Sequence, residues 1–192
     1  MLTIGILAIQ GAFIEHEKRL KGLKINTFEI RQLSDLTKEM DGLILPGGES
    51  TAMKRLLIDL NMFESLKKRI NDGLPTFGIC AGLILLAEDI VNEIPHLGLL
   101  HISVMRNYYG RQKDSFKTIG KSRNKEIPMT FIRAPKIMSI KKDVTPIARY
   151  DSDIVGVLQG HLLGTTFHPE LDHSNHIYEI FIDLIKTNKK TG

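Results

Sequence analysis

One short segment, Gly78-Ile79-Cys80-Ala81-Gly82, constrains this chain more than any other. An apolar run from Leu74 to Ile79 leads into it, and a helix-like apolar run leaves it from Leu83 to Ala87. A strand that turns sharply into a helix holds the side chain at the turn with its reactive atom exposed. The start of the helix beside the sulfur favours a thiolate. We therefore predict that Cys80 is a nucleophile; the alternative is a small buried core cysteine.

The order of the apolar segments predicts the fold. Strand-like segments alternate with amphipathic segments in the first half of the chain, which indicates a parallel sheet with helices on both faces. The expected strands there are Leu2–Ile9, Thr27–Ile30, Gly42–Leu45 and Thr76–Ile79, and the expected helices are Phe13–Leu23, Thr51–Leu60 (capped by Ser50) and Phe63–Ile70.

After about Leu97 the pattern changes to β segments separated by turns, so the sheet is expected to become mixed. The expected elements are strands at Leu99–Met105, Met129–Ile132, Lys136–Ile140, Ile154–Leu158 and Leu162–Phe167, and a closing helix at Asn175–Lys186. We predict one α/β domain over residues 1–192, a three-layer sandwich with a central, largely parallel mixed sheet flanked by helices.

Three turns follow predicted strand ends: Gln10-Gly11, Pro46-Gly47-Gly48 and Cys80. Sites in such sheets lie beyond the carboxyl ends of the strands, so these turns are expected to converge on one edge. Acyl chemistry at a thiol also needs donors for an oxyanion. Glycine lets backbone N–H groups approach a substrate closely, so Gly47 and Gly48, with the N–H of Ala81 after the nucleophile, are the candidate donors.

A nucleophilic thiol needs a base, and the base needs a group that orients it. His168-Pro169-Glu170 directly follows the apolar segment Leu162–Phe167. Proline forces the preceding residue toward an extended conformation, and in extended chain residues i and i+2 point the same way. We therefore expect His168 to act as the proton shuttle of Cys80 and Glu170 to orient it. The alternative is a strand end where both groups are merely solvated.

Composition excludes several other classes of function. The net charge of +4 comes mostly from residues between Lys117 and Lys142, and no nucleic-acid-binding signature accompanies it, so we interpret this segment as a solvated surface. The remaining histidines show no metal spacing, and His173 with His176 lacks a further ligand. We expect no metal and no cofactor.

The N-terminal segment lacks the basic start of a signal peptide and is too short to span a membrane. One cysteine cannot form an internal disulfide, so nothing in the chain requires an oxidising compartment. We expect a cytoplasmic protein with no nucleic-acid or membrane partner.

The motifs Pro46-Gly47-Gly48-Glu49-Ser50-Thr51, Gly78-Ile79-Cys80-Ala81-Gly82 and His168-Pro169-Glu170 together resemble the class I, triad-type glutamine amidotransferases, whose core is flavodoxin-like. Three further stretches narrow the resemblance to the glutaminase subunits of two-component pyridoxal 5′-phosphate synthases: Leu7–Ala12, Arg106–Phe116 and Phe131–Pro135. The similarity runs in register from Met1 to about Phe181.

The resemblance implies roles for individual residues. Cys80, His168 and Glu170 match the catalytic triad of the family. The positions that bind L-glutamine are matched by Gly48, Glu49, Ser50, Arg106, Ile132 and Arg133. An arginine fork suits the α-carboxylate of the substrate, whereas composition alone would favour ordinary surface ion pairs for both arginines. Gln10 matches a position near the interface with the synthase subunit.

Several residues depart from the family pattern: Tyr108, Tyr109, Lys113, Ile79 and the segment Asp172-His173-Ser174-Asn175. None of them removes a catalytic group. They concern the fit of the substrate loop and the contact with the partner subunit rather than the reaction.

The resemblance implies hydrolysis of L-glutamine through a thioester on Cys80, with ammonia passed to a pyridoxal 5′-phosphate synthase subunit. It also implies that docking activates the glutaminase and that the hetero-oligomer is a large assembly. One alternative is the glutaminase of another synthase, such as that of the imidazole glycerol phosphate pathway. The other is a non-catalytic protein on the same scaffold, with Cys80 as a redox sensor.

Overall fold

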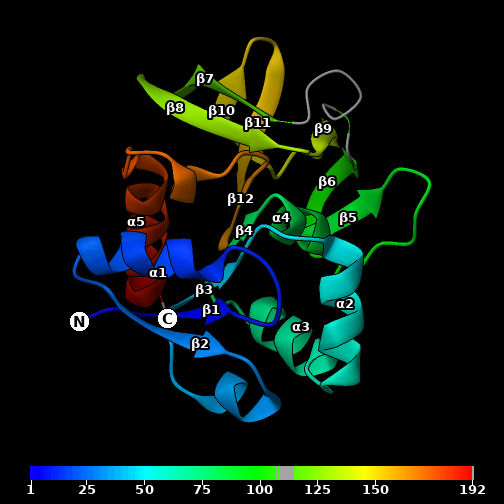
Figure 1. Cartoon of the computed structure of the whole chain (residues 1–192), viewed down its shortest axis with the longest axis vertical. Coiled ribbons are helices and arrows are strands. Elements are labelled where there is room, and N and C mark those ends of the chain that lie inside the picture. Colours follow the sequence, from blue (N-terminus) through cyan, green and yellow to red (C-terminus); the bar gives the residue numbers. More distant parts are fainter. Residues whose placement is uncertain (107, 109–114, 192) are drawn as a thin grey trace.

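A mixed β-sheet with helices on both faces forms the centre of the molecule (Figure 1). The structure is a computed structural model that describes residues 1–106, 108 and 115–191. Its elements are β1 (Thr3–Leu7), α1 (Phe13–Gly22), β2 (Asn26–Ile30), the 3-10 helix η1 (Leu33–Thr37), β3 (Gly42–Leu45), α2 (Ser50–Asp59), α3 (Phe63–Asn71), β4 (Thr76–Ile79), α4 (Ala81–Leu86), β5 (Ala87–Ile90), β6 (Leu100–Met105), β7 (Ser115–Ser122), β8 (Lys125–Ile132), β9 (Lys136–Ile140), β10 (Thr145–Tyr150), β11 (Asp153–Gln159), β12 (Leu162–Thr165), the 3-10 helix η3 (Pro169–Leu171) and α5 (His176–Thr191).

The main sheet has the strand order β2-β1-β3-β4-β12-β11-β10-β7-β8. The strands from β2 to β12 in this order pair in parallel, and those from β12 to β8 pair antiparallel. The expected α/β sheet, parallel at first and mixed in its second half, is therefore confirmed. β12 comes late in the chain but pairs with β4, which places its end next to the strand that carries Cys80.

Alternation along the parallel strands divides the core into two layers. On one face, Ile4, Ile6 and Ile44 pack with residues of α1 and α5. On the other face, Leu43 and Leu45 pack with α2, α3 and α4. Successive side chains of a strand point to opposite faces, so the nearly continuous apolar runs are explained by burial on both sides.

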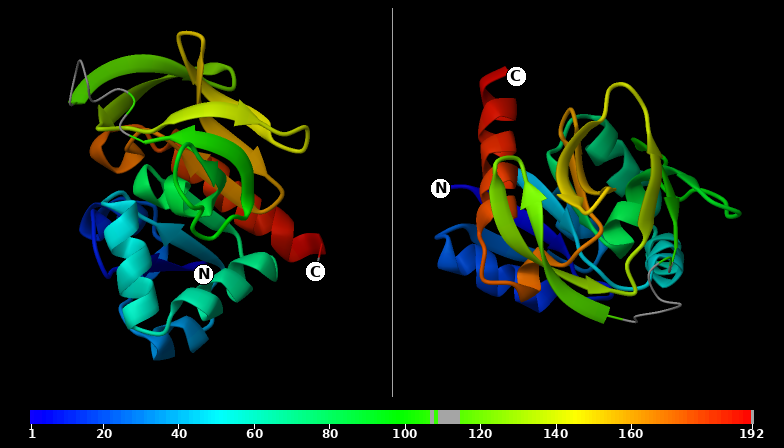
Figure 2. Two further views of the ribbon diagram at one scale, coloured as in Figure 1. Left: turned by 90° about the vertical axis from the view of Figure 1, so that its right-hand side faces the viewer. Right: turned by 90° about the horizontal axis from the view of Figure 1, so that it is seen from above.

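The antiparallel half extends away from α2 and α3 as a ribbon, which Figure 2 shows at the top of its left view. The hairpin β7–β8 carries much of the basic segment predicted to be a solvated surface. Lys117, Lys121, Lys125, Lys141 and Lys142 are all exposed. A second sheet, β5-β6-β9, packs its apolar side chains into the same layer as α4.

Most expected elements are present within a few residues, but three strands were not predicted: β5, β7 and β10. β10 and β7 alternate weakly between polar and apolar residues, and the sheet pairs them through the backbone. Most of the segment between Arg106 and Phe116, including Tyr109 and Lys113, lies outside the described residues. In the part of the chain that the structure describes, no helix is long and apolar enough to cross a membrane.

The predicted cap of α2 is wrong by one residue. Glu49 is the N-cap, and its carboxylate accepts the N–H groups of Thr51 and Ala52 at 3.0 and 2.6 Å. Ser50 is instead the first helical residue and is buried. Serine is a preferred N-cap residue and glutamate is not, so residue type alone favoured Ser50.

Gly82 lets α4 lie directly against the parallel strands. A Cβ at this position would overlap the carbonyl oxygen of Leu45 on β3. The backbone of Gly82 in turn leaves no room for a Cβ at Gly78, which would lie 2.7 Å from the Gly82 carbonyl oxygen. These two glycines therefore serve close packing between α4 and the strands, in addition to the turn for which the sequence suggested them.

We expect Gly82→Ala to destabilise the protein by about 1–3 kcal/mol, because α4 must move away from β3 to admit the methyl group. The matched control is Gly22→Ala at the end of α1, where an added Cβ meets no atom within 4 Å. That substitution should stabilise the protein by about 0.4–1 kcal/mol. Urea unfolding of both variants measures the difference, and equal stabilities would refute the packing role of Gly82.

Candidate active site

Four strand ends meet at one edge of the main sheet. β1, β3, β4 and β12 are neighbours in the sheet order and run in parallel. Leu45 pairs with Gly78, and Thr165 pairs with Ile79, so the last strand residues are nearly level. The predicted convergence of the turns after β1, β3 and β4 is confirmed, and β12 adds the turn that leads to His168.

Cys80 occupies the turn between β4 and α4 in a strained backbone conformation. Its φ of 49° lies in the left-handed region, which non-glycine residues rarely adopt. Its N–H donates to the carbonyl oxygen of Thr165 at 2.8 Å, and its Sγ lies 3.9 Å from the carbonyl oxygen of Ile132. Only 6% of the residue is exposed. Strain at a buried but reachable sulfur is typical of a nucleophile held on a sharp turn.

His168 and Glu170 lie side by side, as the sequence predicted, but for a different backbone reason. Nδ1 of His168 is 2.7 Å from Oε1 of Glu170, and both residues are about 95% buried. The chain does not continue in an extended conformation through Glu170. Pro169 begins the 3-10 helix η3, and this tight turn brings the carboxylate back to the imidazole.

Electrostatics at this pair favour an ionised carboxylate and a charged imidazole. Burial alone would lower the pKa of His168, but its interactions with Cys80 and Glu170 outweigh burial and raise the pKa from 6.5 to about 10. Burial would raise the pKa of Glu170, whereas the hydrogen bond with His168 and the nearby His16 keep it below its usual value. Nε2 of His168 has no hydrogen bond of ordinary geometry among the described residues, although Cys80 is close enough to affect its pKa.

A second set of hydrogen bonds fixes the His168 turn to β8. The N–H of His168 donates to the carbonyl oxygen of Thr130 at 2.8 Å. The carboxylate of Asp172 accepts the N–H and the hydroxyl of Thr130 at 3.0 and 2.8 Å, and it is buried. Asp172, which departs from the family pattern, thus ties η3 to the strand that ends at Ile132.

A cavity of about 360 Å³ opens above these residues. It is lined by Gln10, Gly11, Ala12, Gly47, Gly48, Glu49, Ser50, Cys80, Ile84, Arg106, Ile132, Arg133, His168, Glu170 and Leu171. Every predicted site residue except Ala81 is in this set, and Ala81, the first residue of α4, is buried. Cavities of about 300–1,000 Å³ accommodate small-molecule ligands.

The turn after β3 is shaped around the imidazole. A Cβ at Gly47 would overlap the ring of His168, so only glycine permits this approach. The carbonyl oxygen of Gly47 accepts the N–H of Ala12 at 3.0 Å, which fixes the peptide that joins Gly47 and Gly48. The amide oxygen of Gln10 accepts the N–H of Glu49 at 2.9 Å. Gln10 therefore also supports this turn from inside the cavity.

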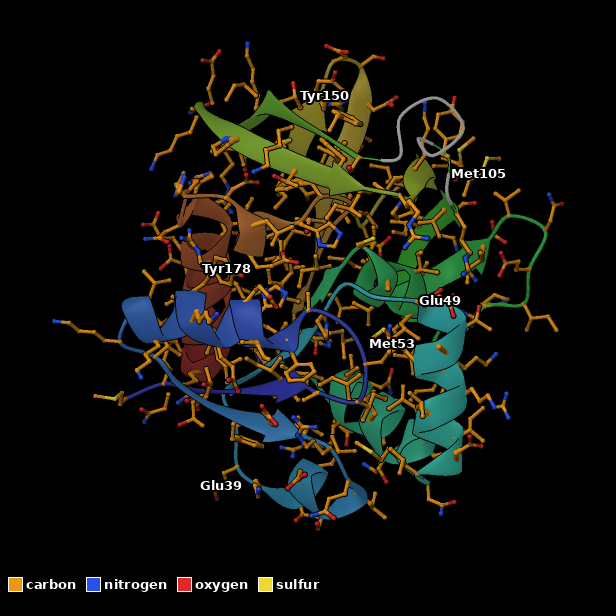
Figure 3. All side chains as sticks on the ribbon, in the orientation of Figure 1. Glu39, Glu49, Met53, Met105, Tyr150 and Tyr178 are labelled. Atoms are coloured by element: carbon orange, nitrogen blue, oxygen red, sulfur yellow. The ribbon has the colours of Figure 1, made fainter. Side chains whose placement is uncertain are left out.

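Arg106 is held at the rim of the cavity by acidic and hydroxyl groups. Its guanidinium donates to Glu49 at 2.5 Å, to Glu93 at 3.0 Å and to Thr51 at 2.6 Å (Figure 3 labels Glu49 at the start of α2). Burial would raise the pKa of Glu49, but the backbone donors of α2 and the Arg106 guanidinium lower it. The buried Oγ of Ser50 has no hydrogen-bond partner in the described residues.

No set of three or more His, Cys, Asp or Glu side chains in the described residues is arranged to hold a metal ion. A larger hollow of about 520 Å³ lies on the outer ribbon between β7 and β10. Its lining includes Lys121, Arg123 and Arg149 but no cysteine, histidine or hydroxyl group. The predicted site residues other than Ala81 all line the smaller cavity.

Sequence reasoning missed three groups that contact the site. Glu93 pairs with Arg106, Asp172 anchors η3, and His16 lies 3.8 Å from the second oxygen of Glu170. Glu93 gave no signal because it is an ordinary acidic residue in a loop, and Asp172 was noted only as part of a segment that departs from the family pattern. His16 did give a signal, because it is a histidine near the start of the helix that follows the predicted Gln10-Gly11 turn.

Comparison with known proteins gives consistent results. The model of the SNO glutamine amidotransferase family matches residues 6–187. The chain is 46% identical to the pyridoxal 5′-phosphate synthase subunit PdxT of Desulfitobacterium hafniense, covering 98% of this chain and 96% of that protein. It is 48% identical to the PdxT of Methanocorpusculum labreanum, covering 96% and 98% respectively.

Solved structures show the same likeness. A crystal structure described as a glutamine amidotransferase superimposes with a TM-score of 0.90 at 38% identity, covering 95% of this chain and 98% of that one. A putative GMP synthase subunit from Thermoplasma acidophilum, at 23% identity and a TM-score of 0.70, shares the fold.

The raised pKa of His168 gives a prediction about its titration. We expect its imidazole to stay protonated through neutral pH and to titrate near pH 10, and Glu170→Gln to lower this pKa because one stabilising anion is lost. Since folding raises the pKa above 6.5, the associated stability is present below pH 6.5 and is lost as the pH rises toward 10.

Histidine NMR across a pH series measures this pKa. The exposed Glu179→Gln on α5 is the matched control and should leave the titration unchanged. Titration of wild-type His168 near 6.5 would contradict the predicted ion pair.

Proposed function

Because the chain belongs to the SNO glutamine amidotransferase family, we propose that it hydrolyses L-glutamine and supplies the ammonia to a separate pyridoxal 5′-phosphate synthase subunit. The observation that carries the proposal is the convergence of Cys80, His168 and Glu170 on one cavity from two neighbouring parallel strands. A role for Cys80 as a redox sensor would leave the buried His168–Glu170 pair without a use.

In the first step, the sulfur of Cys80 attacks the carboxamide carbon of glutamine. The carbonyl oxygen becomes an oxyanion, and the proton from the thiol resides on His168. When the tetrahedral intermediate collapses, the C–N bond breaks and His168 gives this proton to the departing nitrogen, which leaves as ammonia. Glu170 keeps the imidazole oriented and stabilises its charged form, as the short contact at Nδ1 supports.

In the second step, water attacks the thioester that joins glutamate to Cys80. His168 removes a proton from this water and returns it to the sulfur as the C–S bond breaks, which releases glutamate. We propose the N–H groups at Gly47, Gly48 and Ala81 as donors to the oxyanion in both steps. Each such donor contributes roughly 10²–10³ in rate, so the conformation of the Gly47–Gly48 peptide has a large influence on activity.

The rim of the cavity suits the amino-acid end of the substrate. Arg106 presents a guanidinium that would bind the α-carboxylate through two parallel hydrogen bonds. To do so, it would have to give up some of its N–H contacts with Glu49 and Glu93. We propose that the Glu49 carboxylate exchanges its contact with Arg106 for the α-ammonium group while it keeps its backbone donors Thr51 and Ala52. Ser50 adds an Oγ without a partner in the described residues. We assign Gly48, Ile132 and Arg133 to the remaining glutamine contacts because they line the same cavity.

The synthase subunit is the proposed partner because the curated relatives carry the name of a pyridoxal 5′-phosphate synthase subunit. We propose that it docks on the face that contains Gln10, that docking activates the glutaminase, and that the complex is a large hetero-oligomer. Gln10 supports this location because it holds the Gly48–Glu49 turn at the mouth of the cavity. A cytoplasmic location fits a chain whose single cysteine is free.

The first test measures glutamate release from glutamine with and without a pyridoxal 5′-phosphate synthase subunit. We expect low activity alone, a large rise with the partner, and no activity in Cys80→Ala because the nucleophile is lost. Equal activity in both conditions would refute activation by docking. Release by Cys80→Ala at the wild-type rate would refute the thioester mechanism.

Arg106→Lys tests whether the Arg106 guanidinium binds the α-carboxylate of glutamine. Lysine keeps the charge but cannot donate two parallel hydrogen bonds, so we expect the KM for glutamine to rise about tenfold while kcat changes little. The control is Arg149→Lys on the outer ribbon, which lies outside the cavity. An unchanged KM in Arg106→Lys would show that Arg106 does not bind the carboxylate.

A further inference from the structure

His16 is a fully buried histidine that the proposed reaction does not use. It lies on α1 and has no exposed surface. Its Nδ1 is 2.7 Å from the hydroxyl of Tyr178 on α5, and its Nε2 is 3.8 Å from Oε2 of Glu170. Neither Nε2 of His16 nor Oε2 of Glu170 has a hydrogen-bond partner elsewhere in the described residues.

The surroundings of His16 select one protonation state. Burial lowers its pKa more than the Glu170 carboxylate raises it, so the ring is neutral at pH 7. A lone pair on Nε2 would face the carboxylate and be repelled, which favours the tautomer with its proton on Nε2. The hydroxyl of Tyr178 must then donate to Nδ1. Burial raises the pKa of Tyr178, so the hydroxyl keeps the proton that it donates.

We propose that His16 is a positioning residue that directs its Nε2–H at Oε2 of Glu170 and thereby keeps Oε1 on His168. This inference deepens the proposed function and rests on it. The separation of 3.8 Å exceeds a hydrogen bond, so the contact is electrostatic in this state. Catalytic hydrogen bonds are often long without substrate and shorten in the reacting complex.

The same helix also reaches the Gly47–Gly48 turn. The N–H of Ala12, the N-cap of α1, donates to the carbonyl oxygen of Gly47, and His16 follows one turn later. At the other end of the helix, the Arg19 guanidinium donates to Ser174 and Asn175 just before α5. The position of α1 therefore sets the oxyanion turn and the carboxylate contact together.

Four titratable groups face His16 from the elements packed around it: Glu15 on α1, His168 before η3, Glu170 in η3 and Tyr178 on α5. Glu170 is the only one of them that is both within reach of Nε2 and in contact with the proposed base. Loss of His16 should therefore act through Glu170: without the Nε2–H dipole near Oε2, the pKa of Glu170 should rise and its hold on His168 should weaken.

The experiment compares four variants in complex with the synthase subunit. His16→Leu removes both nitrogens, whereas His16→Gln keeps an N–H donor near the position of Nε2. Tyr178→Phe removes only the hydroxyl that fixes the tautomer. Phe181→Leu is the matched control. It removes packing from the same buried layer of α5, and a phenyl ring makes no hydrogen bond to His16 or Glu170.

We expect His16→Leu to lower kcat about tenfold with KM within about twofold, because orientation of the base is lost while the binding residues remain. The acid limb of the kcat/KM profile should move to higher pH, since the pKa of Glu170 rises. His16→Gln should recover most of kcat, and Tyr178→Phe should lie between them. Phe181→Leu should unfold at lower urea concentration but keep the wild-type kcat.

NMR supplies a readout that needs no turnover. In the wild type, nitrogen shifts should show a neutral His16 with its proton on Nε2, and the carboxyl signal of Glu170 should titrate at higher pH in His16→Leu. A proton on Nδ1, an unchanged Glu170 titration, or His16→Gln as slow as His16→Leu would overturn the inference. If the wild type released no glutamate, the proposed function would fail and the NMR result would still decide the role of His16.

Discussion

Parallel pairing of β12 with β4 is the constraint on which the rest of the site depends. The two strands end level, with Thr165 opposite Ile79, so the residues that follow them are adjacent in space although 88 positions separate Cys80 from His168. β3 pairs with the other side of β4 and brings the Gly47 turn to the same edge. The proposed nucleophile, base and oxyanion turn thus share one rigid frame, which is what precise orientation in catalysis requires.

Burial then sets the charges in that frame. The His168–Glu170 pair is almost entirely removed from water, where an uncompensated charge is costly, so each group depends on the other and on its next neighbours. Thr130 and Asp172 fix the backbone of the turn, while His16 and Tyr178 lie behind the carboxylate. The chemistry at the sulfur is therefore supported from β8, α1 and α5 as well as from the strand ends.

Local sequence patterns predicted much of this arrangement. Continuous apolar runs gave the parallel strands, because burial on both faces allows no polar alternation. The strands β5, β7 and β10 were missed because polar and apolar residues do not alternate clearly along them, although Ile90 on β5 and Ile147 on β10 are buried in the core. The cap of α2 was placed on Ser50 because serine is a preferred N-cap residue. In the fold, the Glu49 carboxylate accepts the first N–H groups of the helix instead.

The sequence by itself determined the chemical groups and their local geometry: a cysteine between close-packed glycines, a His-Pro-Glu turn, and a glycine pair after a strand. It also determined the family, through motifs spread along the whole chain. Only the tertiary structure decided which other residues contact these groups and hold them in place. His16, Glu93 and Asp172 reach the site through contacts 13 to 154 residues apart in the chain, and such pairings depend on how helices and loops pack, which no local pattern records.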